Sequence, residues 1–89
     1  MTAPLLDAAA LAAALQALPS WGGTTDRISR TVPGSCLPEV ARLADEADHH
    51  PVVEPAGDDA RLVLWTHSAG GVTAQDTALA ARIDALLTG

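Results

Sequence analysis

The sequence predicts an α+β domain in which a helix, two strands, a second helix, two more strands and a third helix follow one another. Three observations support this prediction. Apolar residues recur at helical spacing in three segments, β-prone residues fill the segments between them, and Gly or Pro stands at several boundaries. Strands joined by short turns favour a four-stranded antiparallel sheet with the helices packed on one face.

The first helix and the first pair of strands are predicted from residues 7 to 34. Asp7 is suited to cap a helix that runs to about Leu18, where a Pro-Ser pair ends it. Residues 22–26 indicate a hairpin turn or a weak edge strand, and residues 27–32 alternate polar and β-prone side chains as a strand does. A Pro-Gly pair then ends this strand.

A second helix and a β-hairpin are predicted next. The helix begins near residues 35–38, since proline is accepted in a first turn, and Pro51 ends it or forces an extended exit. Residues 52–54 and 61–66 are predicted to pair as antiparallel strands across a turn at 56–59. The sequence signals for these two strands are the strongest strand signals in the chain.

The third helix is predicted to begin after Thr73, which is an N-cap candidate. Asp76 follows three residues later and gives a variant of the capping box, with Asp in place of Glu or Gln. Apolar residues at helical spacing continue to Leu87 and supply a buried face. No repeat or interdomain linker is visible, so residues 1–89 are predicted to form one domain.

Composition limits the classes of function. The formal net charge is −6 at pH 7, so direct binding to nucleic-acid phosphates is not expected. No signal peptide is visible and no apolar run is long enough to span a bilayer. The single Cys36 cannot form an intramolecular disulfide, which favours the cytoplasm. Because so short a chain buries a small core, a homo-oligomer is expected.

The three histidines are the strongest functional signal. His49 and His50 are adjacent at the end of the second predicted helix, and His67 arrives on the last predicted strand. Asp45 lies one helical turn before His49 and would be stacked beside it, while Asp76 follows the glycine-rich bend after His67. If the helix end and the strand end converge, three imidazoles and two carboxylates line one cleft.

Two kinds of chemistry suit these side chains. Asp45, His49 and His67 could supply zinc ligands, but the four-residue spacing usual for a helical pair of histidine ligands is absent. Acid–base catalysis needs only imidazoles that exchange protons and carboxylates that fix their tautomer and orientation. The residues therefore favour acid–base catalysis, with a small metal-binding module as an alternative.

Several short motifs occur in order along the chain. They are Asp-His-His-Pro at 48–51, Trp-Thr-His at 65–67, Gly-Gly-Val-Thr-x-x-Asp at 70–76 and Ile-Asp at 83–84 in an Ala-rich helix. Together with the order of elements, they resemble the pterin-4a-carbinolamine dehydratases. The resemblance is dense from Asp45 to about Leu87. Between Trp21 and His49 the chain is shorter than that family by about two helical turns.

The resemblance implies a lyase that works without a metal or an organic cofactor. Members dehydrate a 4a-hydroxytetrahydropterin to the quinonoid dihydropterin in tetrahydrobiopterin recycling. By this resemblance His49 and His67 would be the acid–base pair, and His50 would hold and polarise the pterin. The residues that would bind the substrate or orient the imidazoles are Asp45, Asp76 and Trp65.

The resemblance also carries a second hypothesis. Members of this fold are known in non-catalytic roles, so the chain could be a protein-interaction module, either a coactivator or an assembly chaperone. A scaffold has no physical reason to keep three imidazoles and both carboxylates together. Retention of all five favours the enzyme.

Overall fold

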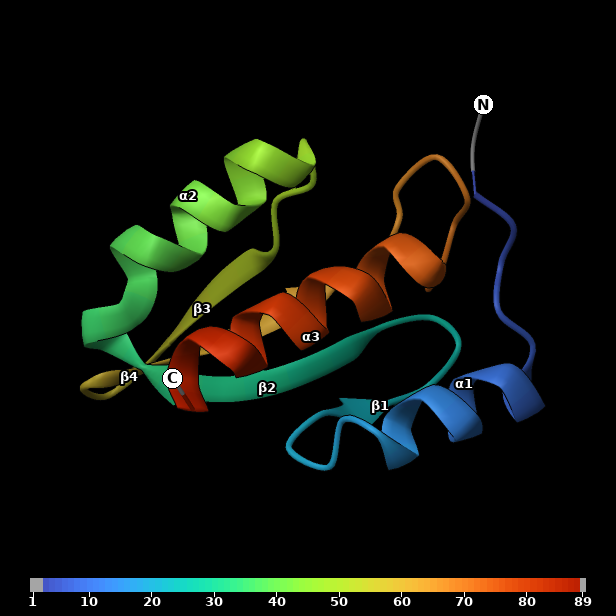
Figure 1. Cartoon of the computed structure of the whole chain (residues 1–89), viewed down its shortest axis with the longest axis horizontal. Helices are drawn as coiled ribbons and strands as arrows, with labels where there is room; N and C mark the ends of the chain where they lie inside the picture. Colours follow the sequence, from blue (N-terminus) through green and yellow to red (C-terminus); the bar gives the residue numbers. More distant parts are fainter. Residues whose placement is uncertain (1–2, 89) are drawn as a thin grey trace.

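The computed structural model describes residues 3–88 and confirms the α+β fold (Figure 1). No helix within these residues has the length and apolar character needed to cross a bilayer. The elements are α1 (Ala8–Gln16), β1 (Gly22–Gly23), β2 (Ile28–Pro33), a 3-10 turn (Gly34–Cys36), α2 (Leu37–Ala47), β3 (Val52–Ala56), β4 (Asp59–Leu64) and α3 (Ala74–Thr88).

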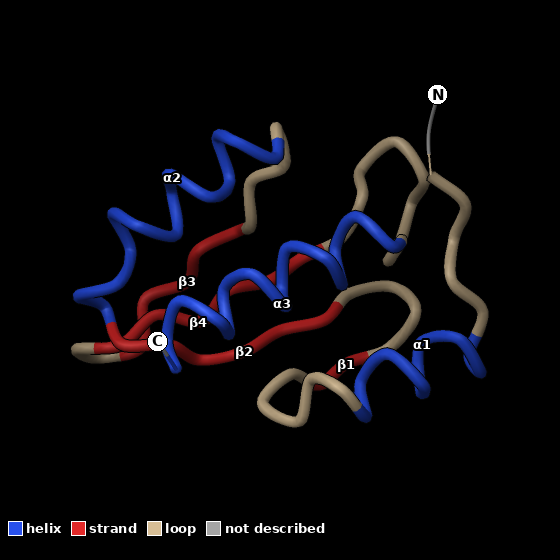
Figure 2. Tube along the Cα trace, in the orientation of Figure 1, coloured by secondary structure: helices blue, strands red, loops and turns tan. Residues whose placement is uncertain are grey.

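The strands form one antiparallel sheet in the order β1-β2-β4-β3 (Figure 2). β2 and β4 lie at the centre, with Ile28 opposite Leu64. β3 and β4 form the predicted hairpin, and their pairing continues to Ala56 and Asp59, so the turn is tighter than predicted. β1 is short and lies at one edge, as expected of a weak edge strand.

One face of the sheet packs against the helices, as predicted. Side chains alternate between the two faces of a strand, so every second residue of β2 and β4 faces the helices. Outward-facing residues such as Thr31 and Arg61 are exposed. The inward-facing residues share one hydrophobic cluster with all three helices, and this cluster includes Leu11, Ile28, Val32, Val40, Leu43, Leu62, Leu64, Leu79 and Ile83.

A polar contact fastens α3 to the sheet. The carboxylate of Asp84 accepts a hydrogen bond from the Trp21 indole N–H at 2.8 Å and another from Arg30 at 2.5 Å. The Arg30–Asp84 ion pair is only about one-fifth exposed on either side, and charged hydrogen bonds are the stronger ones. This contact fixes the rotation of α3 about its axis. It thereby helps to set the direction of Asp76, about two turns earlier on the helix.

The second helix ends earlier than predicted. Asp48 adopts the left-handed conformation, with φ of 51° and ψ of 42°. Its N–H donates to the Asp45 carbonyl at 3.2 Å, and the N–H of His49 donates to the Ala44 carbonyl at 3.0 Å. This is the Schellman pattern that closes many helices. The prediction that the helix extends through His49 is therefore wrong, because His49 lies beyond its end.

The fourth strand also ends earlier than predicted. Its pairing stops at Leu64, and Thr66 makes only an isolated bridge to Gly71. The Thr66 carbonyl instead accepts the N–H of Gly70 at 2.9 Å, which turns the chain. His67 therefore lies in a loop, and the prediction that it arrives on the strand is wrong.

Candidate active site

The loop between β4 and α3 carries the motif residues toward the end of α2. The N–H of Thr66 donates to the Gly71 carbonyl at 2.8 Å and closes the loop around His67. Gly70 has φ of 77°, a conformation that a side chain would strain. A Cβ on Gly71 would lie 2.7 Å from the Thr25 carbonyl oxygen, so only glycine allows this close approach. The two glycines are thus explained by backbone geometry.

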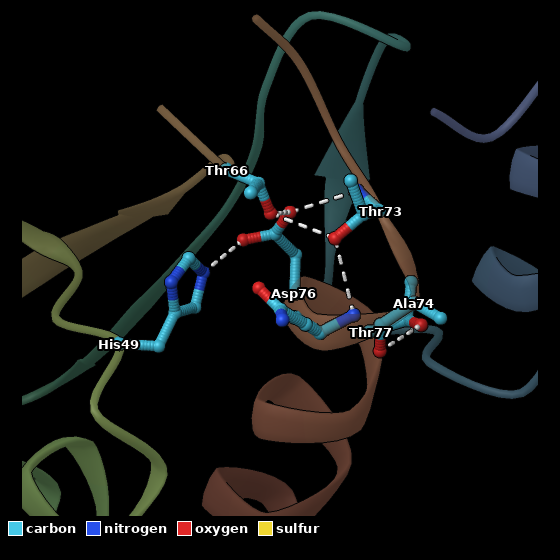
Figure 3. A network of polar contacts seen from close by, with 7 residues as sticks. His49, Thr66, Thr73, Ala74, Asp76 and Thr77 are labelled. Atoms are coloured by element: carbon cyan, nitrogen blue, oxygen red, sulfur yellow. Dashed lines mark hydrogen bonds and ion pairs between the residues drawn. The ribbon is translucent and has the colours of Figure 1, made fainter. Parts of the chain in front are cut away.

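Asp76 is the buried centre of the site (Figure 3). Its Oδ2 accepts the N–H of Thr73 at 2.8 Å and the hydroxyl of Thr66 at 2.8 Å. The two threonine hydroxyls are 2.7 Å apart, and the Thr73 hydroxyl also accepts the N–H of Gln75 at 3.2 Å. A fully buried carboxylate needs such partners, because water cannot solvate it. The predicted capping contact between Thr73 and Asp76 is present.

The second oxygen of Asp76 holds His49. The Nε2 atom of His49, 27 positions earlier in the chain, forms a hydrogen bond with Oδ1 (Figure 3). The imidazole is 15% exposed and the carboxylate 0%. Because an ionised carboxylate only accepts, Nε2 carries the proton and Nδ1 is the nitrogen that can take one up. This is the arrangement that orients a general base.

His50 and Asp45 form a separate pair. Nε2 of His50 lies 2.7 Å from Oδ1 of Asp45, and both side chains are more than half exposed. The expected stacking of Asp45 on His49 is wrong, because the left-handed residue at the end of α2 turns His49 away from the helix. An exposed pair of this kind stabilises the fold little, so it holds His50 only loosely.

The three histidines line one cleft. It has a volume of about 260 Å³, and its walls are Asp48, His49, His50, Val52, Trp65 and His67. Trp65 forms a wall together with His67, with 6.0 Å between the ring centroids. Asp45 and Asp76 do not line the cleft themselves. Instead, Asp76 is hydrogen-bonded to His49 and Asp45 to His50, and both of these imidazoles line the cleft.

The donor set suits proton transfer. Within residues 3–88, no three His, Cys, Asp or Glu side chains gather as a metal site, and Asp45 does not join His49 and His67 as the zinc hypothesis requires. Cys36 lies in the 3-10 turn before α2, where burial raises the pKa of its thiol and keeps it protonated. What remains is a cleft with three imidazoles, one of which is fixed by a buried carboxylate.

Thr66 is a site residue that the sequence analysis does not identify. It is 5% exposed, and its hydroxyl lies between Asp76 and Thr73. One signal was available in the sequence. In the predicted strand 61–66, residues 62, 64 and 66 alternate toward the same face, so an inward-facing hydroxyl at position 66 needs a buried partner.

We expect Thr66→Val to lower the free energy of unfolding by about 1–3 kcal/mol, because it removes a buried hydrogen bond to a charged acceptor while keeping the side-chain shape. Thr31→Val makes the same change at an exposed position of β2 and should alter stability by less than about 0.5 kcal/mol. Urea unfolding of both variants measures the difference. Equal effects would mean that the Thr66 hydroxyl adds nothing to the network.

The fold and the cleft define a small α+β domain with three histidines on one cleft. Residues 4–86 match the family described as pterin 4 alpha carbinolamine dehydratase, and the chain belongs to this family. The family resemblance noted in the sequence is therefore confirmed.

Relatives support this membership along almost the whole chain. A protein of Nocardia farcinica is 42% identical to this chain over 97% of this chain and 98% of its own length. A protein of Thermomicrobium roseum is 39% identical over 88% of this chain and 91% of its own length. Both carry the name "Putative pterin-4-alpha-carbinolamine dehydratase". The crystal structure of a "transcriptional coactivator/pterin dehydratase" from Brucella melitensis matches with a TM-score of 0.82 and 29% identity, covering 91% of this chain and 96% of that one.

Proposed function

We propose that this protein dehydrates a 4a-hydroxytetrahydropterin to the quinonoid dihydropterin and water, as a step of tetrahydrobiopterin recycling. The observation that carries the proposal is the convergence of His49, His50 and His67 on one cleft. Membership of the dehydratase family supports a pterin as the substrate. The imidazoles supply the proton donors and acceptors that the reaction requires.

The proposed reaction removes one proton and delivers another. Nδ1 of His49 takes the proton from N5 of the pterin, and the electron pair of that bond forms the N5=C4a double bond. The C4a–O bond breaks, and His67 gives a proton to the departing hydroxyl, which leaves as water. Asp76 is a positioning residue: it holds the tautomer of His49 and stabilises the imidazolium that forms. One proton is taken and one is given, so the reaction balances.

His50 and Trp65 are proposed to hold the pterin. Trp65 is half-buried and lines the cleft beside His67, where its ring offers a flat apolar surface. His50 is 59% exposed and held only by Asp45, so it can turn toward a bound ligand. Asp45 would then act through His50, as a second positioning residue.

A dehydration assay with freshly generated 4a-hydroxytetrahydropterin tests the proposal. We expect the native chain to exceed the rate in buffer, and His67→Ala to lower that rate at least about tenfold, or about 1.4 kcal/mol of transition-state stabilisation. His67 is exposed in a loop, so the variant should keep the native unfolding temperature. A native rate no better than buffer would contradict the proposal and favour a non-catalytic interaction module.

A further inference from the structure

His67 has no carboxylate to fix its imidazole. Asp76 and Asp45 hold the other two histidines, whereas His67 forms no ion pair with any carboxylate of residues 3–88. The ring contact of His67 is with Trp65, at 6.0 Å between the centroids and 35° between the planes. Because His67 is exposed in its loop, its direction depends on what holds Trp65 and the loop in place.

The hairpin turn between β1 and β2 holds the C-terminal end of this loop. The N–H of Val72 donates to the Thr25 carbonyl at 2.8 Å. The turn is itself closed, because the N–H of Thr24 donates to the Arg27 carbonyl at 2.9 Å. A backbone hydrogen bond therefore ties the loop to a closed turn on the C-terminal side of His67.

Arg27 connects the same turn to the other end of the loop. Ile28 pairs with Leu64 where β2 begins and β4 ends, and the next residues beyond this pair are Arg27 and Trp65. The guanidinium carbon of Arg27 lies 4.4 Å from the centre of the Trp65 ring, a cation–π contact. No carboxylate competes for this cation, since none of the ion pairs among the described residues includes Arg27. The turn therefore contacts the loop on both sides of His67.

The Trp65 ring borders two cavities, so packing alone does not fix it. One cavity is the histidine cleft, and the other, of about 620 Å³, is lined on the side of the turn by Thr24, Asp26 and Arg27. A half-buried ring beside open space has room to rotate. A guanidinium stacks on an aromatic face and so restricts this rotation without filling the cavity.

We propose that Arg27 is a positioning residue, which holds the Trp65 ring and thereby fixes the direction of the His67 imidazole. This inference rests on the proposed function, in which His67 gives a proton to the departing hydroxyl. Arg27 has no contact with the pterin in that mechanism. Its effect on the reaction therefore passes through Trp65 and His67.

A double-mutant cycle tests this path. We expect Arg27→Met to lower kcat/KM of the native chain about fivefold, or about 1 kcal/mol of transition-state stabilisation, the size of one cation–π contact. In a His67→Ala background the same substitution should have no effect, because the side chain that Arg27 positions is gone. A loss that persists without His67 would overturn the inference, since Arg27 would then act on the pterin directly.

Two further variants control for charge. Arg27→Lys keeps the cation beside the ring and should restore part of the lost rate, although an ammonium does not stack as a guanidinium does. Arg42→Met removes the same charge from an exposed position of α2 and should keep the native rate. Equal losses in Arg27→Met and Arg42→Met would mean that the effect is one of net charge and would overturn the inference.

The NMR signals of the His67 imidazole test the inference without turnover. The His67→Ala variant assigns these signals in a proton–carbon correlation spectrum, and the ring current of Trp65 makes them sensitive to the relative orientation of the two rings. We expect Arg27→Met to shift the His67 signals while those of His49 stay in place.

The two measurements separate this inference from the proposed function. An Arg27-dependent shift of the His67 signals in a chain without turnover would support the role of Arg27 and reject the dehydratase. Turnover in a chain whose His67 signals ignore Arg27→Met would support the dehydratase and reject the role of Arg27. Unchanged signals in a chain without turnover would reject both.

Discussion

Replacing His49 with alanine is expected to lower kcat/KM for 4a-hydroxytetrahydropterin by about 10²- to 10⁴-fold, the usual contribution of a positioned acid or base. This corresponds to about 3–5 kcal/mol of transition-state stabilisation. The reason is that, among the side chains of residues 3–88, only the imidazole of His49 is held by a fully buried carboxylate. Steady-state kinetics of the native and variant chains measure the loss.

Two further variants show whether the loss is chemical. His49→Ala leaves Oδ1 of Asp76 without its partner, which alone destabilises the fold by about 1–3 kcal/mol. His49→Gln keeps an N–H donor near the position of Nε2 but cannot exchange protons, so it should be as inactive as His49→Ala and more stable. His50→Ala removes a loosely held imidazole and should cost less activity than His49→Ala. A His49→Gln chain with more than a tenth of native activity would contradict the role of His49.

The largest effect on stability is expected for Asp76→Ala. The substitution leaves the N–H groups of Thr73 and His49 without an acceptor, whereas the hydroxyl of Thr66 can still bond that of Thr73. At about 1–3 kcal/mol for each unpaired donor, the loss is about 2–5 kcal/mol, a large part of the stability of a small domain. Thermal unfolding followed by circular dichroism should show a fall in Tm of at least about 10 °C.

The variant Asp76→Asn separates the effect of Asp76 on stability from its effect on catalytic activity. The amide oxygen can keep the hydrogen bonds from Thr73 and Thr66, so stability should stay closer to native than in the alanine variant. The amide nitrogen then faces His49 and donates to Nε2, which moves the ring proton to Nδ1 and removes the proposed base. We expect a loss of activity comparable with that of His49→Ala. A fully active Asp76→Asn chain would reduce Asp76 to the capping residue of α3.

The order of the elements was predictable because each signal is local. The N-cap role of Asp7 is confirmed, since its carboxylate accepts the N–H of Ala10 at 2.7 Å. The hairpin of β3 and β4 follows from β-prone residues on either side of a turn. The end of α2 was not predictable in the same way, because Asp48 is not glycine and yet adopts a left-handed conformation. Such a residue gives no composition signal, and proline three positions later was the stronger local stop.

The members of the site were more predictable than their pairing. The residue types identified the three histidines, and the structure brings all three into one cleft. The pairing of carboxylates with imidazoles depended on the path of the chain after α2, which helical spacing could not supply. His49 therefore meets Asp76 rather than Asp45. The contact between the Arg27 guanidinium and the Trp65 ring, at 4.4 Å from the ring centre, was not predictable either, because it depends on the strand register that two distant segments adopt when they pair.

The distance in sequence between His49 and Asp76 has a consequence for the order of folding. Their contact spans 27 residues and requires that the β3–β4 hairpin be closed and that α3 be docked on the sheet. Local contacts form early, whereas contacts that close long loops come late. The histidine cleft should therefore be absent from partly folded chains, and the proposed pterin should bind the native state alone. At a hundred times its Kd, such a ligand would stabilise the native chain by about 2.7 kcal/mol, so the proposed substrate would also protect this small domain against unfolding.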